Sequence, residues 1–168
     1  LFPAREPGRS GSSTLAKGSL ALIGLVYLMI LSGGLVAGTH AGYAYSTWPL
    51  MGTSFIPPGL YSGSPAWLDA FEDITAIQFN HRMFAYLLFV LINVFAVRVF
   101  YKARNARERW GAVLVGLAVW LQVTLGISTL LLHVPVAIAA AHQGGAVALL
   151  SATLFVSHVL VRQRVAQE

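Results

Sequence analysis

The chain has 168 residues, of which 57% are hydrophobic and only 10% are charged, and its formal net charge is +5. Soluble domains carry about 25% charged residues because a water-facing surface needs them, so we expect most of this surface to face lipid. The basic residues lie in short clusters between apolar runs, without the polar scaffold and stacking aromatics of a nucleic-acid-binding protein. The sequence has no cysteine, which excludes disulfides, zinc–thiolate sites, iron–sulfur clusters and a thiol nucleophile.

The first sixteen residues are predicted to form a polar linker or tail. Residues 1–14 are rich in Ser, Gly, Pro and Arg, and they lack the apolar run of a signal peptide. The sequence also begins with Leu1 rather than Met. We therefore expect the chain to be a piece of a longer protein.

Four stretches are long and apolar enough to cross a bilayer as helices. A span needs about 20 mostly apolar residues, because the hydrocarbon core is about 30 Å thick and a helix rises about 1.5 Å per residue. The four stretches are residues 17–39, 74–100, 110–132 and 135–161. The predicted fold is all-α: a polytopic membrane four-helix bundle over residues 17–161, followed by a cytoplasmic tail at residues 162–168.

The longest connection, residues 41–73, joins the first two spans and is rich in proline and aromatic residues. Repeated prolines prevent a continuous helix, and tryptophan suits the headgroup layer, so we expect this loop to cover the mouth of the bundle. The loop has no Lys or Arg, whereas basic residues precede the first span, join the second to the third and follow the fourth. By the positive-inside rule, both termini should be cytoplasmic (or in the matrix) and the loop should lie outside.

Two histidines are predicted to lie at one level on two different helices. His81 lies about five residues into the second span and His142 about seven residues into the fourth, and both spans run from outside to inside. At about 1.5 Å per residue, both lie roughly 8–10 Å below the outer boundary. Ionisable residues inside a membrane are costly and indicate function. Two neutral imidazoles at one level suit the axial ligation of a heme iron; alternatively, each is a hydrogen-bonding contact between helices.

The residues beside these histidines suit a porphyrin. Small residues at helical spacing remove bulk around His142, namely Ala139, Gly145 and Ala146. Arg82 is the only positive side chain on the outer half of the bundle, where it could pair with a heme propionate or extend to the lipid headgroups. Gln78, one turn above His81, could orient the imidazole or bond to a neighbouring helix.

The other three histidines are predicted to lie away from this pair. His158 lies sixteen residues beyond His142, about 24 Å deeper, so it cannot bind the same iron and we expect it at the inner interface. His40 and His133 lie near the outer mouth, at the end of the first span and in a loop. They could touch substrate or a propionate, or together bind a transition metal.

Three motifs, in chain order, resemble the carboxy-terminal half of the heme A synthase family. They are GGLVAGTHAGYAYSTWPLMG, IQFNHR and LLLHVPVAIAAAHQGG, and the resemblance covers about residues 33–150. It implies an eight-helix protein of two four-helix halves that oxidises a ring methyl of heme O to a formyl group, which gives heme A for terminal oxidases. It further implies that His81 of QFNHR and His142 of AHQGG are the axial ligands of a heme b cofactor.

The same resemblance implies the partners and the location of the chain. In the family, the amino-terminal half carries a Glu-x-x-His arrangement, and that half is missing from this chain. In the half that is present, the position equivalent to that Glu is Gln78. A neutral amide cannot accept a proton as a carboxylate does, so this half is interpreted as the cofactor side. Expected partners are heme O as substrate, the lipid bilayer, the missing half or a second copy of the chain, and heme O synthase. The expected location is the inner (plasma) membrane of a bacterium, or the mitochondrial inner membrane of a eukaryote.

Three functions are compatible with these features. The first is an oxidoreductase of heme A biosynthesis, with this chain as the half that holds heme b. The alternative is a four-helix membrane cytochrome b that acts only as an electron carrier, although such a protein usually has a second histidine pair on the inner side, where this chain has only His158. The third is a non-heme membrane subunit or transporter in which the histidines are packing residues.

Overall fold

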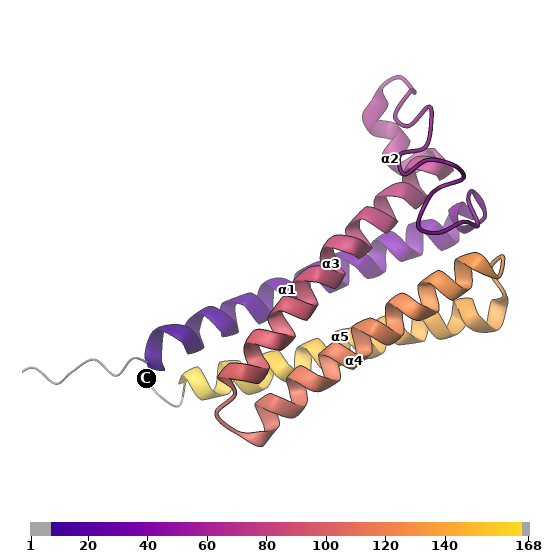
Figure 1. Ribbon diagram of the computed structural model, residues 1–168. Helices are drawn as coiled ribbons and strands as arrows, with labels where there is room; N and C mark the ends of the chain where they lie inside the picture. The colour runs from indigo at the N-terminus through magenta and orange to yellow at the C-terminus, as the bar shows by residue number, and fades with distance from the viewer. Residues whose placement is uncertain (1–7, 166–168) are drawn as a thin grey trace, which may run out of the picture.

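The computed structural model of this chain describes residues 8–165, and this part is built from helices (Figure 1). The four long helices are α1 (Gly8–Gly38), α3 (Ile74–Lys102), α4 (Ala106–Leu131) and α5 (Val136–Val165). The connection between α1 and α3 contains the short helix α2 (Asp69–Glu72) and the 3₁₀ turns η1 (Ala41–Tyr43) and η2 (Ala66–Leu68). Each long helix is long and apolar enough to cross a membrane. The predicted all-α membrane fold is confirmed.

The first helix begins earlier than the sequence predicts. The predicted span starts at residue 17, but α1 starts at Gly8, so half of the predicted polar linker is helical. The part of α1 that is apolar enough to span a membrane is Thr14–Gly38. The chain has no proline between Pro7 and Pro49, so nothing prevents the helix from extending beyond its apolar segment. Residues 1–7 and 166–168, which hold the rest of the predicted linker and the last three residues of the predicted tail, lie outside the described residues, and residues 162–165 of that tail continue α5.

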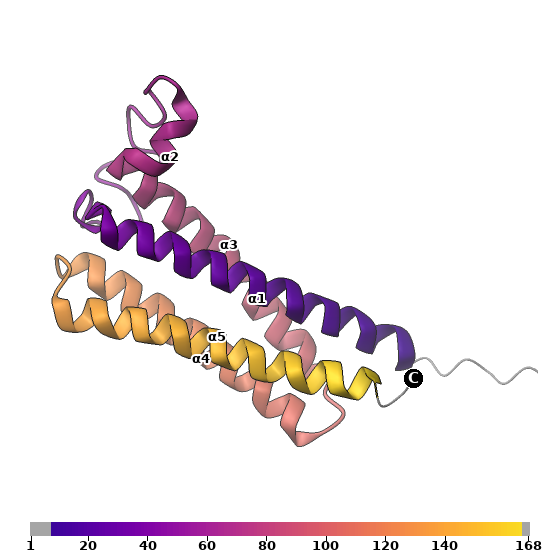
Figure 2. The ribbon, with the colours of Figure 1, turned by 180° about the vertical axis from the view of Figure 1, so that it is seen from behind.

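The four helices form a bundle with two different ends. In both views, the connection of residues 39–73 and the turn between α4 and α5 lie at one end, which we call the loop end (Figures 1 and 2). The start of α1, the end of α5 and the connection between α3 and α4 lie at the other end. The Lys and Arg clusters of the sequence belong to this second end, which we call the basic end. Helices α1 and α4 each pack against both α3 and α5, so α3 and α5 lie diagonally across the bundle.

The buried apolar core lies in one half of the bundle. It is built from residues 16–26 of α1, 88–99 of α3, 112–119 of α4 and 149–160 of α5. All four segments belong to the half at the basic end. The half at the loop end, which holds His81 and His142, contributes no residue to this buried cluster. Four apolar residues at the loop end are also buried, namely Ala41, Met51, Ala76 and Ile77, but they lie outside this cluster.

Candidate functional site

The structure brings His81 and His142 to similar heights in the bundle. His81 lies seven residues after Ile74, the first residue of α3, and His142 lies six residues after Val136, the first residue of α5. Both helices begin at the loop end, so at about 1.5 Å per residue each histidine lies about 10 Å along its helix. The two imidazoles are half-buried and close enough to interact electrostatically. They therefore approach each other from diagonal corners of the bundle.

His81 is oriented by a hydroxyl of the neighbouring helix α1. The Ser32 Oγ lies 3.0 Å from Nδ1 of His81. A Cβ atom added at Gly33 would lie 3.5 Å from Cε1 of His81, so the backbone of α1 passes close to the ring. With Nδ1 engaged by Ser32, Nε2 is the ring nitrogen left to bind another group. A partner on one ring nitrogen that fixes the ring and its tautomer is typical of histidines that ligate a metal.

His142 is held by a different helix, α4. The Gln122 Nε2 donates to the backbone oxygen of His142 at 3.0 Å, and a Cβ atom at Gly126 would lie only 2.9 Å from Cε1 of the imidazole. Nδ1 of His142 and Oε1 of Gln122 are both buried without a hydrogen-bond partner in the described part of the chain. Buried polar atoms without partners are uncommon and call for an explanation. Here they show that the polar atoms around the His142 ring are not all paired within the chain.

These features fit a heme between the two imidazoles. Each ring is approached by a glycine of the adjacent helix, Nδ1 of His142 is buried without a partner, and the main buried apolar cluster lies in the other half of the bundle. One expected feature is wrong. A Cβ atom at Gly145 would collide with the amide oxygen of Gln122, so Gly145 allows close packing of α5 on α4 instead of offering a flat face to a porphyrin.

Arg82 is buried and binds the long connection. It is 7% exposed, and its guanidinium donates to the backbone oxygens of Tyr45 at 2.9 Å, Thr47 at 3.0 Å and Leu50 at 3.4 Å. A side chain that extends to the lipid headgroups would be exposed, so that interpretation of Arg82 is wrong. The guanidinium instead ties residues 45–50 to the top of α3.

Gln78 belongs to the same contact. It is 3% exposed, and its Nε2 donates to the backbone oxygens of Gly42 at 3.2 Å and Tyr45 at 3.1 Å. The Oε1 atom of Gln78 accepts a hydrogen bond of 3.4 Å from Arg82. Gln78 therefore does not bond to the His81 ring, and Ser32, which sequence reasoning missed, does. The pair of Arg82 and Gln78 holds the connection down over the end of the bundle that contains the histidines.

The remaining histidines lie apart from this pair. His158 is exposed on α5 near the basic end. His40 and His133 are exposed residues with positive φ in the turns that follow α1 and α4, which explains why neither continues a helix. Within residues 8–165, no group of three or more His, Cys, Asp or Glu side chains is arranged to hold a metal ion. The candidate site is therefore formed by His81 and His142.

Comparison with known proteins agrees with this geometry. A family model described as cytochrome oxidase assembly protein matches residues 3–154. The chain is 44% identical over 163 residues to a heme A synthase of Nitrosospira multiformis, a match that covers 94% of this chain and 46% of the relative. This chain belongs to the heme A synthase family. Heme A synthases of Nitrosomonas eutropha and Parvibaculum lavamentivorans are 44% and 38% identical to it over 146 and 148 residues, or 87% and 88% of this chain.

The chain spans about half the length of the heme A synthases that it matches. The aligned parts are 46%, 41% and 42% of the three relatives. Both His81 and His142 lie within the residues matched by the family model, and His158 lies beyond them. The matched range therefore contains His81 and His142, together with His40 and His133.

Proposed function

We propose that this chain holds heme b between His81 and His142 as one half of a heme A synthase, which oxidises the ring methyl of heme O to a formyl group. The observation that carries this proposal is the convergence of the two imidazoles, at matched heights on diagonal helices, in the half of the bundle that lies outside the main buried apolar cluster. Membership of the heme A synthase family supports the choice of reaction.

The residues around the site have different roles in holding the cofactor. His81, oriented by Ser32, and His142, held by Gln122, would hold the heme through their imidazoles. A bound heme b supplies reversible one-electron transfer. Arg82 and Gln78 act in this proposal by fixing the connection of residues 42–50 over the site, which limits the access of water. A direct bond from Arg82 to a heme propionate would require it to exchange one of these carbonyl partners.

The methyl oxidation itself belongs, in this proposal, to a partner. Gln78 occupies the position at which, according to the resemblance, the amino-terminal half of the family has a glutamate. An amide does not accept protons at neutral pH. We infer that an amino-terminal half, or a second copy of this chain, completes the substrate side, with heme O delivered by heme O synthase. We also infer that the basic end faces the cytoplasm or matrix, in the plasma membrane of a bacterium or the mitochondrial inner membrane.

A spectrum tests the cofactor. Purified wild-type chain should give a reduced-minus-oxidised difference spectrum with the bands of a low-spin b-type heme. His81→Ala and His142→Ala should each abolish these bands, because each removes one axial ligand. His158→Ala is the matched control and should leave the spectrum unchanged. A wild-type spectrum without heme bands, or a loss of heme in the His158 variant alone, would overturn the proposal.

A product analysis tests the reaction. The chain is co-expressed with heme O synthase and with the amino-terminal half of a related heme A synthase, and the hemes are extracted and separated by chromatography. Formyl heme should accumulate when the amino-terminal half is present, or with this chain alone if a second copy completes the substrate side, and in both cases it should be lost with His142→Ala. A chain that carries heme b but yields no formyl heme in any combination would be an electron carrier, and the biosynthetic part of the proposal would fail.

A further inference from the structure

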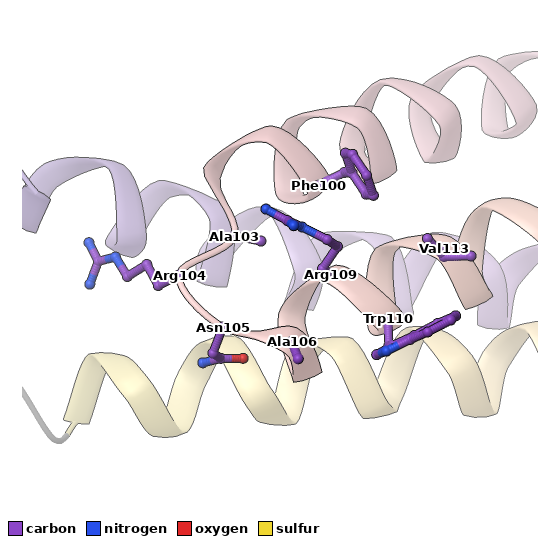
Figure 3. A pocket seen from close by; sticks show the side chains of 8 residues that line it. All are labelled: Phe100, Ala103, Arg104, Asn105, Ala106, Arg109, Trp110 and Val113. Carbon is purple, nitrogen blue, oxygen red and sulfur yellow. The ribbon is translucent and has the colours of Figure 1, made fainter.

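A cavity of about 480 Å³ lies at the basic end of the bundle, far from the two histidines. It is formed where the last turn of α3 meets the connection to α4 and the first turns of α4 (Figure 3). Phe100, Trp110 and Val113 give it apolar walls, and its polar lining residues are Arg104, Asn105 and Arg109. The cavity therefore combines a cation with an apolar lining.

Of the two arginines that line the cavity, Arg109 is the one that stacks on its aromatic wall. Its guanidinium carbon lies 5.3 Å from the centre of the Phe100 ring, and Figure 3 shows the side chain extending beside that ring, whereas Arg104 extends away from it. Stacking on an aromatic face leaves the N–H groups at the edge of a guanidinium able to donate. No carboxylate forms an ion pair with Arg109 in the part of the chain that the structure describes. The guanidinium is therefore held in place while its charge stays without an acidic partner.

The neighbouring acid is already engaged. Glu108 is 3% exposed, and its Oε2 accepts a hydrogen bond of 2.6 Å from the backbone N–H of Arg104. The Asn105 Oδ1 accepts from the backbone N–H of Glu108 at 3.0 Å, so α4 begins with a side-chain cap. The first turn of α4 thus has its own capping groups. We therefore take the Arg109 guanidinium, and not the start of the helix, as the group that binds an anion in this cavity.

The surroundings of the cavity are those of a membrane surface with an excess of positive charge. Five basic residues of this region are exposed, namely Arg98, Lys102, Arg104, Arg107 and Arg109. Trp110 and Tyr101 are 65% and 82% exposed, and exposed Trp and Tyr at the ends of spans are typical of the lipid headgroup layer. Val113 continues the cavity toward the apolar part of α4.

We propose that this cavity binds an anionic phospholipid, with the headgroup phosphate on Arg109 and the upper part of an acyl chain along Trp110 and Val113. A guanidinium matches the geometry of a phosphate oxygen pair, and basic pockets between membrane helices are sites for acidic headgroups. A soluble phosphate would use the cation but not the apolar wall. A neutral phospholipid would use the wall, but its own cation would compete with Arg109 for the phosphate. The anionic lipid uses both.

Native mass spectrometry of the full chain in neutral detergent tests this site. The chain is titrated with phosphatidylglycerol or phosphatidylcholine, and the fraction carrying one lipid is measured with and without excess inorganic phosphate. The wild type should prefer phosphatidylglycerol, and inorganic phosphate should not displace it. Arg109→Gln should weaken the binding of phosphatidylglycerol about tenfold, because it removes a charge-assisted hydrogen bond. Arg107→Gln removes the same charge two residues away, outside the cavity lining, and should change the binding by less than about twofold.

Two further outcomes would overturn the proposal. Equal weakening by the Arg107 and Arg109 variants would mean that the lipid is held by diffuse surface charge, and displacement by inorganic phosphate would mean that the site takes a soluble anion. Val113→Trp keeps every charge and fills the cavity, so it tests the site if Arg109→Gln fails to fold. A folded Val113→Trp chain that still binds phosphatidylglycerol as tightly as the wild type would exclude this cavity as the lipid site.

Discussion

Gln122 holds the backbone of His142 and leaves the imidazole without a hydrogen bond. The Gln122 Nε2 donates to the His142 backbone oxygen at 3.0 Å, while Oε1 of Gln122 and Nδ1 of His142 are both buried and without partners in the described residues. A histidine that ligates a metal through one nitrogen usually donates the other N–H to an oxygen acceptor. The acceptor that this ring lacks is therefore carried by the side chain that already contacts His142. A small rotation or one bridging water would join them.

Replacing Gln122 should consequently weaken heme binding. Gln122→Leu removes both the donor to the backbone and the acceptor for Nδ1, and we expect heme affinity to fall about 10- to 100-fold, as for other outer partners of metal-ligating histidines. Gln122→Glu keeps an acceptor oxygen for Nδ1, so it should bind heme more tightly than Gln122→Leu, and its added negative charge should lower the midpoint potential of the bound heme. Heme titration and redox potentiometry check both. A Gln122→Leu variant whose heme affinity and midpoint potential equal those of the wild type would show that Gln122 has no role in the site.

Ser32 should have a comparable effect on His81. Ser32→Ala removes the oxygen that lies 3.0 Å from Nδ1 of His81, so we expect a heme affinity lower by about tenfold or more. Ser19→Ala is the matched control on the same helix, because the Ser19 hydroxyl donates to Ser157 at 3.0 Å within the core. It should lower the free energy of unfolding by about 1 kcal/mol without changing heme affinity. Equal losses of heme in both variants would show that Ser32 acts only through the stability of the bundle.

The sequence predicts the helices and the heights of the two histidines, but not the contacts between helices. Apolar windows define the four spans, and counting residues from the start of two spans is enough to bring His81 and His142 to one level. The partners Ser32 and Gln122 depend on how α1 and α4 rotate about their axes, and no local pattern specifies that rotation. The targets of Arg82 are backbone oxygens of a loop, whose path is set by tertiary packing. The expectation for Gly145 fails for the same reason, because its contact with α4 depends on helix orientation.

Gly126 should be intolerant of a side chain. A Cβ atom there would lie 2.9 Å from Cε1 of His142, so Gly126→Ala forces the ring or the helix to move, at about 1–3 kcal/mol. We expect a lower unfolding temperature and a loss of low-spin heme. Gly144→Ala is the control, since a Cβ atom there meets nothing within 4 Å and alanine favours a helix by up to about 1 kcal/mol. If both variants keep heme equally well, the contact between α4 and the imidazole does not contribute to heme binding.

Arg82 should control the order of the loop end. Arg82→Gln removes the guanidinium bonds to the backbone oxygens of Tyr45 and Thr47, and bonds to a charged group contribute about 1.5–3 kcal/mol each. The backbone N–H groups of Met51 and Gly52, which donate to Ser54 and Thr47, should then exchange with solvent deuterium at least about tenfold faster. Hydrogen–deuterium exchange with mass spectrometry of peptides from this connection measures the change.

The control for this last variant is Arg98→Gln, which removes an exposed charge farther along the same helix α3. It should leave the exchange of residues 44–55 unchanged, because Arg98 lies toward the basic end and the connection lies at the loop end. Exchange and heme affinity together separate the two roles of Arg82. If the guanidinium mainly held the connection, exchange would rise whether or not heme is bound. If it mainly paired with a heme propionate, Arg82→Gln would lower heme affinity and leave exchange in the heme-free chain as slow as in the wild type, which would contradict the role derived from its carbonyl contacts.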